Sequence, residues 1–243
     1  MNMLEFLLSK IEPVKIIETK EEFYPPGWIH NGLSFIETVR ESNAIKSKSS
    51  KTKEDLIILQ NVKILRTCYC TPDFILELGT YFVGKYTLDP FYNPYSLIKN
   101  EKFSELEKFK TLDGIAGRDG FNILNWEGDC VFVNPPFDKL SEAARLCNTY
   151  CKYQHEPGII FICNLDNTLY YQECMKTADY LIQLGRINFN PLPGLKNSSP
   201  TNSSAMFVYN SSLETDTGFL TLKNKAYHCT NLKNRKITEL KND

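Results

Sequence analysis

The sequence lacks the features that define several classes of protein. No apolar run approaches the roughly 18 residues that a membrane-spanning helix needs, so we expect no membrane partner. The chain has 8 cysteines and 3 histidines but no Cys-x-x-Cys pair, so we expect no metal site. The formal net charge is −1, so the chain as a whole has no excess of positive charge with which to hold a nucleic acid.

The cysteines indicate a cellular compartment. Cys130 and Cys163 lie inside apolar stretches, which is typical of small buried thiols in a reducing compartment. The start of the chain, MNMLEFLLSKIEPVK, has a short apolar stretch interrupted by Glu5 and no small-residue cleavage site, so it is a poor signal peptide. We therefore expect an intracellular protein of the cytoplasm or the nucleus.

Short apolar strands alternate with helices along the chain. The runs Cys130–Val133 and Gly158–Cys163 are apolar without alternation, which is typical of buried strands. The alternation predicts an α/β fold with a mostly parallel sheet and helices on both faces. Further strands are expected at 86–89, 180–182, 186–189 and 205–209, and helices at 96–110, 140–151, 169–176 and from Thr71-Pro72, with Thr71 as N-cap.

We divide the chain into three parts. Residues 1–66 form an N-terminal extension with a helix and a basic, mobile loop at 42–53. Residues 67–210 form the main domain, and residues 211–243 form a basic C-terminal extension. Ligands of sheets with parallel strands bind at the carboxyl ends of the strands, where the sequence places Asp89 and Asn134.

The stretch Asn134-Pro135-Pro136-Phe137 follows the apolar run 130–133 directly. Two consecutive prolines have a fixed φ and no N–H donor, so the turn is stiff and its carbonyls can point outward as acceptors. The Asn side chain adds an acceptor, and the aromatic ring offers a stacking surface. Such a turn suits the task of holding an exocyclic or amide nitrogen while it attacks an electrophile, although Asn-Pro alone is typical of a plain turn after a strand.

The ordered set of motifs resembles the phage-type, Dam-like DNA N-6-adenine methyltransferases over residues 68–210. Two departures stand out: Phe137 replaces the usual tyrosine, and Asn93-Pro94 stands where a glycine-rich loop would follow Asp89. The motifs, in order, are Thr71-Pro72, Leu88-Asp89-Pro90-Phe91, Asp119-Gly120-Phe121, Trp126, Asn134-Pro135-Pro136-Phe137, Gly185-Arg186-Ile187-Asn188-Phe189 and Ser203-Ser204-Ala205.

The resemblance implies a Rossmann-like methyltransferase sheet, S-adenosylmethionine as methyl donor, and DNA as partner, with a homodimer left open. Asn134, Pro135, Pro136 and Phe137 would be catalytic. Trp126 is expected in the core. The implied cofactor-binding residues are Thr71, Pro72, Asp89, Phe91, Asp119, Gly120 and Phe121, and the expected nucleic-acid contacts are Lys46, Lys48, Lys51, Lys53, Arg186, Ser203, Lys233 and Arg235.

Each of these interpretations has a structural alternative. Thr71 can be an ordinary N-cap, Asp89 can start a turn before proline, and Asp119-Gly120 can be a generic turn. Arg186 can form an internal ion pair, and each lysine run alone is typical of a solvated loop. The Asn-Pro-Pro-aromatic turn also serves methylation of RNA and of protein glutamine, and a catalytically inactive nucleic-acid-binding subunit with this fold is a further alternative.

Overall fold

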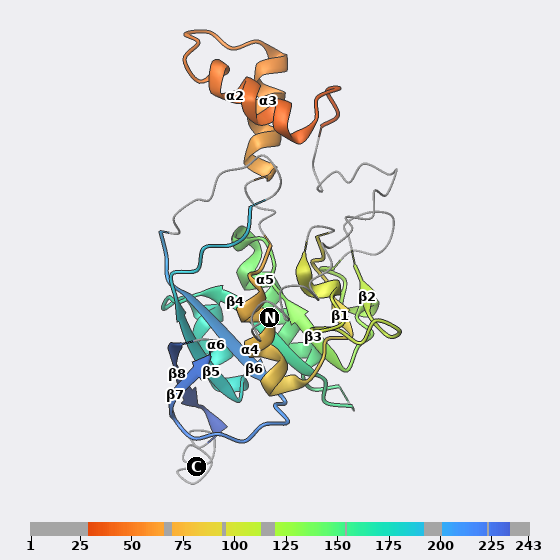
Figure 1. Cartoon of the computed structure of the whole chain (residues 1–243), viewed down its shortest axis with the longest axis vertical. Helices are drawn as coiled ribbons and strands as arrows, with labels where there is room; N and C mark the ends of the chain where they lie inside the picture. The colour runs from red at the N-terminus through yellow and green to blue at the C-terminus, as the bar shows by residue number, and fades with distance from the viewer. Residues whose placement is uncertain are drawn as a thin grey trace, which may run out of the picture.

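The computed structural model describes residues 29–65, 70–93, 96–112, 120–153, 155–191, 201–222 and 224–233. Within these residues, one mixed sheet forms the centre of the molecule (Figure 1), with the strand order β2-β1-β3-β4-β6-β5-β8-β7. The strands are β1 (Leu88–Asp89), β2 (Lys110–Thr111), β3 (Cys130–Val133), β4 (Gly158–Asn164), β5 (Tyr180–Gly185), β6 (Ser204–Tyr209), β7 (Gly218–Leu222) and β8 (Lys225–Asn231). The helices are α2 (Phe35–Ile45), α3 (Lys53–Leu65), α4 (Asp73–Val83), α5 (Leu140–Tyr150) and α6 (Leu169–Thr177), with 3₁₀ turns η1 (Leu97–Lys99), η2 (Ile123–Asn125) and η3 (Phe137–Lys139).

The sheet has a parallel half and an antiparallel half. Strands β2, β1, β3 and β4 pair in parallel, whereas β4, β6, β5, β8 and β7 pair antiparallel. The prediction of an α/β fold is confirmed, but the prediction of a mostly parallel sheet is wrong. Antiparallel neighbours need only a short connection, and β7 joins β8 through a short connection that includes Asn224, with φ 63°.

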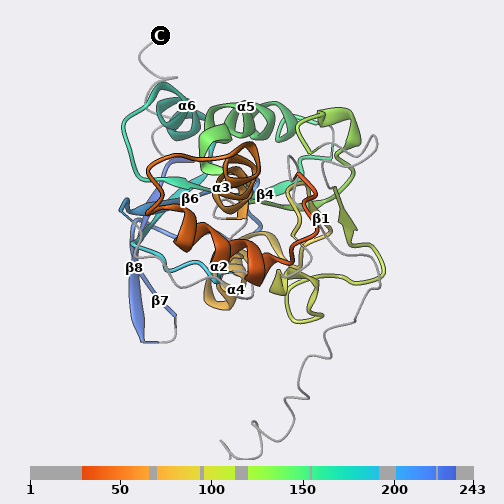
Figure 2. The same ribbon diagram turned by 90° about the horizontal axis from the view of Figure 1, so that it is seen from above.

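Helices cover both faces of the sheet, as the sequence predicts (Figure 2). Side chains of β3 alternate between two cores: Val131 and Val133 pack with α5 and α6, and Phe132 packs with α4 on the other face. This alternation follows from the two-residue period of a strand. Cys163 is buried in the first core, in agreement with its interpretation as a small buried thiol.

The predicted N-cap of α4 and the predicted helix over 96–110 differ in the structure. Thr71 is not the N-cap of α4, because Pro72 takes that position without a side-chain hydrogen bond. A helix over 96–110 does not form; only η1 is helical there. The buried residues Ile98 and Phe103 are five positions apart, a spacing that does not define one helical face. The backbone of Ser104 instead forms an isolated parallel bridge with Tyr86.

The expected strand at 186–189 is also absent from the described chain. β5 ends at Gly185, whose φ is 68°, and its register against β6 shifts between Gln183 and Gly185. A positive φ is readily adopted by glycine. The bulge turns the chain out of the sheet before Arg186, so residues 186–190 run along its edge instead.

The N-terminal extension is more regular than expected in its described part. The segment 42–53, predicted to be mobile, contains the end of α2, a turn and the start of α3. Ser34 and Glu37 form a capping box at the start of α2. The expected helix at the start of the chain and residues 234–243 lie outside the described residues.

The segment after residue 210, expected as an extension, contributes β7 and β8 to the same sheet. β8 pairs with β5, so this part of the chain continues the antiparallel half. Over the described ranges, no helix has both the length and the apolar character required to cross a bilayer.

Candidate functional site

The carboxyl ends of β1, β3, β4 and β5 lie at one edge of the sheet, which we call the carboxyl edge. Asp89 is the last residue of β1, and Asn134 directly follows β3, its parallel neighbour. Because parallel strands end at the same edge, these two side chains are placed at neighbouring positions, as the sequence predicts. β6 runs in the opposite direction and begins at this edge, where Ser204 pairs with Asn164.

Asn134 is half-buried and fixed by a residue from a distant segment. Its Nδ2 donates a hydrogen bond to Oγ1 of the buried Thr71, over 2.9 Å. Thr71 was expected to serve the cofactor or to cap α4, but its hydroxyl instead holds the amide of Asn134. Because the amide nitrogen is occupied, the side chain presents Oδ1 as an acceptor, and no described residue donates a hydrogen bond to it.

The residues after Asn134 form a stiff, partly exposed corner. Pro135 is buried, and the carbonyl of Pro136 accepts a hydrogen bond from the backbone N–H of Lys139 at 2.9 Å. Phe137 follows with 45% of its surface exposed. Its ring stands edge-on to Phe189, with 5.7 Å between the ring centroids. The exposed ring of Phe137 and the half-buried ring of Phe189 therefore form an aromatic pair at the corner that follows Asn134.

Phe189 is tied to the same corner through the backbone. Asn190 and Cys70 exchange two hydrogen bonds of 2.8 Å, N–H to carbonyl in both directions. This bridge joins the segment after β5 to the segment that carries Thr71. The motif at 185–189 was part of the resemblance, but Phe189 was not among the predicted site residues. Its position at the end of that motif, after Arg186 and Ile187, was the sequence signal by which it could have been included.

Asp89 is a carboxylate in an apolar setting. Only 4% of its surface is exposed, and its Oδ1 accepts one hydrogen bond, from the backbone N–H of Phe91 at 2.9 Å. No described cation pairs with it. Burial raises the pKa of Asp89 to about 7. The charge of Asp89 also acts on Tyr92. Burial, and after it the charge of Asp89, raises the pKa of Tyr92 to about 12.

Aromatic rings and a glycine lie beside Asp89. The rings of Phe91 and Phe121 are 4.7 Å apart, and the carbonyl of Gly120 accepts a hydrogen bond from Nε1 of the buried Trp126 at 2.8 Å. A Cβ at Gly120 would stand 1.9 Å from the carbonyl oxygen of Pro90, so only glycine fits. The structure thus brings together the predicted cofactor residues that it describes in this region, and Trp126 is core, as expected. Asp119 lies outside the described residues.

Lys139 connects this group to the Asn134 corner. Its Nζ lies 6.0 Å from the ring centroid of Phe121, while Lys139 itself ends η3, which begins at Phe137. Pro72 caps α4 at the carboxyl edge, next to Thr71. The expected catalytic and cofactor residues of the described chain therefore share one edge of the sheet.

The predicted nucleic-acid contacts are more dispersed. Arg186 is exposed after β5 at the carboxyl edge and forms no ion pair with a described residue. Ser203, half-buried before β6, lies at the same edge, and its carbonyl accepts a hydrogen bond from Leu165 N. Lys233 follows β8 at the opposite edge, 3.9 Å from Asp179 and over the ring of Tyr180, so the structure does not bring it to the site. Arg235 lies outside the described residues.

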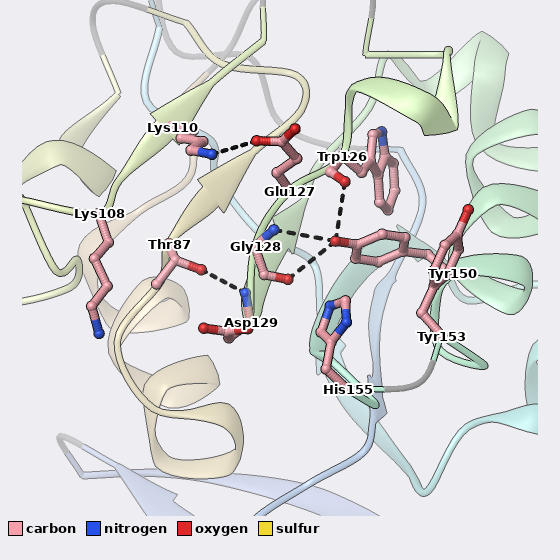
Figure 3. A pocket seen from close by; sticks show the side chains of 10 residues that line it. All are labelled: Thr87, Lys108, Lys110, Trp126, Glu127, Gly128, Asp129, Tyr150, Tyr153 and His155. Atoms are coloured by element: carbon pink, nitrogen blue, oxygen red, sulfur yellow. Dashed lines mark hydrogen bonds and ion pairs between the residues drawn. The ribbon is translucent and has the colours of Figure 1, made fainter.

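A cavity of about 520 Å³ opens at the opposite, amino edge of the sheet (Figure 3). Tyr150 stands at its wall, donating a hydrogen bond to the carbonyl of Trp126 and accepting one from the N–H of Gly128. None of the predicted catalytic or cofactor residues lines this cavity. Among the residues with described positions, no group of three or more His, Cys, Asp or Glu side chains is arranged to hold a metal ion.

Comparison of the chain with models of protein families, with curated proteins and with solved structures found no match. Its function is therefore inferred from the sequence motifs and from the geometry of the carboxyl edge.

Proposed function

We propose that the protein is an S-adenosylmethionine-dependent DNA methyltransferase that methylates the exocyclic N6 of a flipped-out adenine. The observation that carries this proposal is the fixed amide of Asn134. Thr71 occupies its nitrogen, so its oxygen is an oriented acceptor beside a diproline corner and an exposed ring. The parallel half of the sheet supports a Rossmann-like methyltransferase architecture, in which ligands bind at the carboxyl ends of the strands.

The residues around Asp89 fit the proposed cofactor. A buried carboxylate with one hydrogen bond and no described cationic partner would gain from the amino or hydroxyl donors that S-adenosylmethionine carries. The rings of Phe91 and Phe121, 4.7 Å apart, would offer an apolar surface to the planar adenine of the cofactor. The cofactor, when bound, supplies a methyl group made electrophilic by its sulfonium, so the protein's task is to position the acceptor nitrogen.

Asn134 and its corner would act on that nitrogen. Oδ1 of Asn134 and the carbonyl of Pro135 would accept the two hydrogens of the adenine amino group. Two acceptors in this arrangement weaken the conjugation of the nitrogen with its ring and make its lone pair available for attack. A duplex hides this group, so the base must leave the stack, and Phe137 with Phe189 would provide the surface on which it rests.

The hydrogen bond from Asn134 to Thr71 gives a prediction for kcat. Thr71→Val keeps the shape of this buried residue and removes the hydroxyl, so the amide of Asn134 loses its anchor. We expect kcat to fall about tenfold, which corresponds to roughly 1.4 kcal/mol, with KM for the cofactor unchanged. Thr71→Ser should restore the rate in steady-state assays; an undiminished kcat in Thr71→Val would contradict this positioning role.

Phe137 gives a prediction for base flipping. Phe137→Ala removes a stacking surface worth about 1–3 kcal/mol per base, so DNA affinity should fall about 5- to 150-fold. The fluorescence of 2-aminopurine at the target position should rise on binding to the wild type and stay low with the variant. Phe219→Ala removes a more exposed phenylalanine, 73% accessible, on β7, and should bind like the wild type. Equal losses in both variants would oppose the role of Phe137.

The acceptor is identified by one experiment. The protein is incubated with tritiated S-adenosylmethionine and separate pools of DNA, RNA and protein, with Asn134→Ala alongside. Label recovered from DNA as N6-methyladenine, and absent with the variant, supports the proposal. Label in RNA or in protein glutamine would instead identify that molecule as the methyl acceptor. A calorimetric titration with S-adenosylmethionine that shows no heat of binding would indicate an inactive subunit.

A further inference from the structure

The turn between α2 and α3 is strongly basic. Residues 46–53 read KSKSSKTK, with four lysines and no acidic residue. Lys46, Lys51 and Lys53 are exposed and form no ion pair with a described residue. Nζ of Lys46 donates a hydrogen bond to the neutral side chain of Asn43, at 3.3 Å. Three cations of this turn are therefore available to an anionic partner.

The fourth lysine holds the turn in shape. Lys48 pairs with the buried Asp55 at 2.9 Å, and its hydrogen bond is the main cause of a lowered pKa of Asp55. Asp55 also accepts a hydrogen bond from the backbone N–H of Thr52 at 3.0 Å, while Oγ1 of Thr52 accepts one from the N–H of Asp55 at 3.2 Å. Lys48, expected as a phosphate contact, is thus a structural residue, and the turn presents the other lysines from a fixed geometry.

The α2–α3 pair stands next to the carboxyl edge. The two helices pack against each other more than against any other element. α3 ends at Leu65, and Thr71, six positions later, contacts Asn134. In Figure 1, α3 points away from the sheet with the basic turn at its far end, and in Figure 2 the pair lies in front of the sheet when seen from above. A helix of 13 residues is about 20 Å long, which sets the reach of the turn.

We propose that the α2–α3 pair is an arm that grips the DNA backbone at least about six base pairs from the target adenine. Successive phosphates on one strand are spaced about 3.4 Å apart along the axis of the duplex, so the length of α3 spans about six steps. The location of the target adenine rests on the proposed function. The turn contains no aromatic residue, so base stacking is not its mode of contact; lysines act on phosphates as point charges, which makes the grip independent of sequence.

The experiment compares three proteins on two duplexes. One duplex carries about three base pairs on each side of the target adenine and the other about twelve, so that only the longer one reaches the turn. The arm variant is Lys46→Gln, Lys51→Gln and Lys53→Gln together. The control variant makes the same charge change at Lys85, Lys152 and Lys176, which are exposed and lie near the amino edge.

The wild type and the control should bind the longer duplex more tightly and share one salt dependence. The arm variant should gain no affinity from the longer duplex. On that duplex its slope of log affinity against log salt should be smaller by about 2–3, the value for three lost phosphate contacts. Its methyl transfer to the short duplex should equal that of the wild type.

Equal salt slopes in the three proteins, or equal affinity of the wild type for the two duplexes, would reject the proposed role of the α2–α3 pair in DNA binding. Neither result would contradict the proposed methyl transfer. A preserved difference in slope without methyl transfer to any DNA would instead reject the proposed function and keep the basic turn as a phosphate contact.

Discussion

Asn134→Ala should lower kcat for methyl transfer by about 10²–10³-fold, the range for removal of one preorganised hydrogen-bonding group at a reacting centre. The side chain contributes one hydrogen bond to the fold, to Thr71, so the free energy of unfolding should fall by only about 1 kcal/mol. Steady-state kinetics and urea unfolding on the same preparation separate the two effects. Cofactor affinity should be unchanged, because the cofactor is expected at Asp89.

Asn210→Ala is the matched control for this prediction. The Nδ2 of Asn210 donates to the carbonyls of Cys151 and Pro157 at 2.8 and 3.0 Å, and its φ is 49°. The variant should lose about 1–3 kcal/mol of stability from two hydrogen bonds and from a conformation that alanine resists, yet keep its kcat. An Asn134→Ala protein that transfers methyl groups at the wild-type rate would refute the catalytic assignment.

Asp89→Asn should remove a pH dependence of stability. The pKa of Asp89 is raised from 3.8 to about 7 in the folded protein, so between these values the unfolded chain has released a proton that the folded chain keeps. The contribution of Asp89 to the free energy of unfolding is therefore full below pH 4, falls as the pH rises to about 7, and is constant above it. A shift of this size corresponds to about 4 kcal/mol.

The measurement is urea unfolding of both proteins from pH 4 to pH 8. The variant should match the wild type near pH 4 and exceed it by up to about 4 kcal/mol at pH 8, while losing cofactor binding in calorimetry. Asp216→Asn, an exposed aspartate near the start of β7, should change neither. Parallel stability curves for wild type and Asp89→Asn would show that Asp89 ionises as it does in the unfolded chain.

Cofactor binding should itself release a proton from the wild type. Hydrogen-bond donors on a ligand favour the ionised carboxylate and lower its pKa, so at pH 6 the mostly protonated Asp89 would lose its proton on binding. Calorimetry in buffers with different ionisation enthalpies measures this release, which should disappear at pH 8.

The site was predictable where local pattern and local chemistry coincide. An apolar run followed by Asn-Pro-Pro-Phe fixes both a buried strand and a stiff corner, and β3 and Asn134 are found there. Gly158–Cys163 is likewise a central strand, because an apolar run without alternation needs cover on both faces. The order of the strands was not predictable, since the insertion of β6 between β4 and β5 depends on pairing between distant segments.

Side-chain partners were the least predictable part of the site. The sequence marks Thr71 as a helix start, but its hydroxyl is used 63 positions away, by Asn134. Nothing in the sequence distinguishes Lys48 from the lysines near it, and only the fold shows that it forms an ion pair with Asp55. The bulge at Gly185 turns the chain so that Phe189 meets Phe137, a contact that no local pattern encodes.

The backbone bridge between Cys70 and Asn190 has a consequence for synthesis of the protein. The corner at Asn134 is braced from both sides by segments that leave the ribosome far apart in time. A nascent chain that has not yet extended past residue 190 has the diproline corner but only one of its two braces. The proposed methyl transfer should therefore require a chain that extends past residue 190, and chains stalled before that point should be inactive.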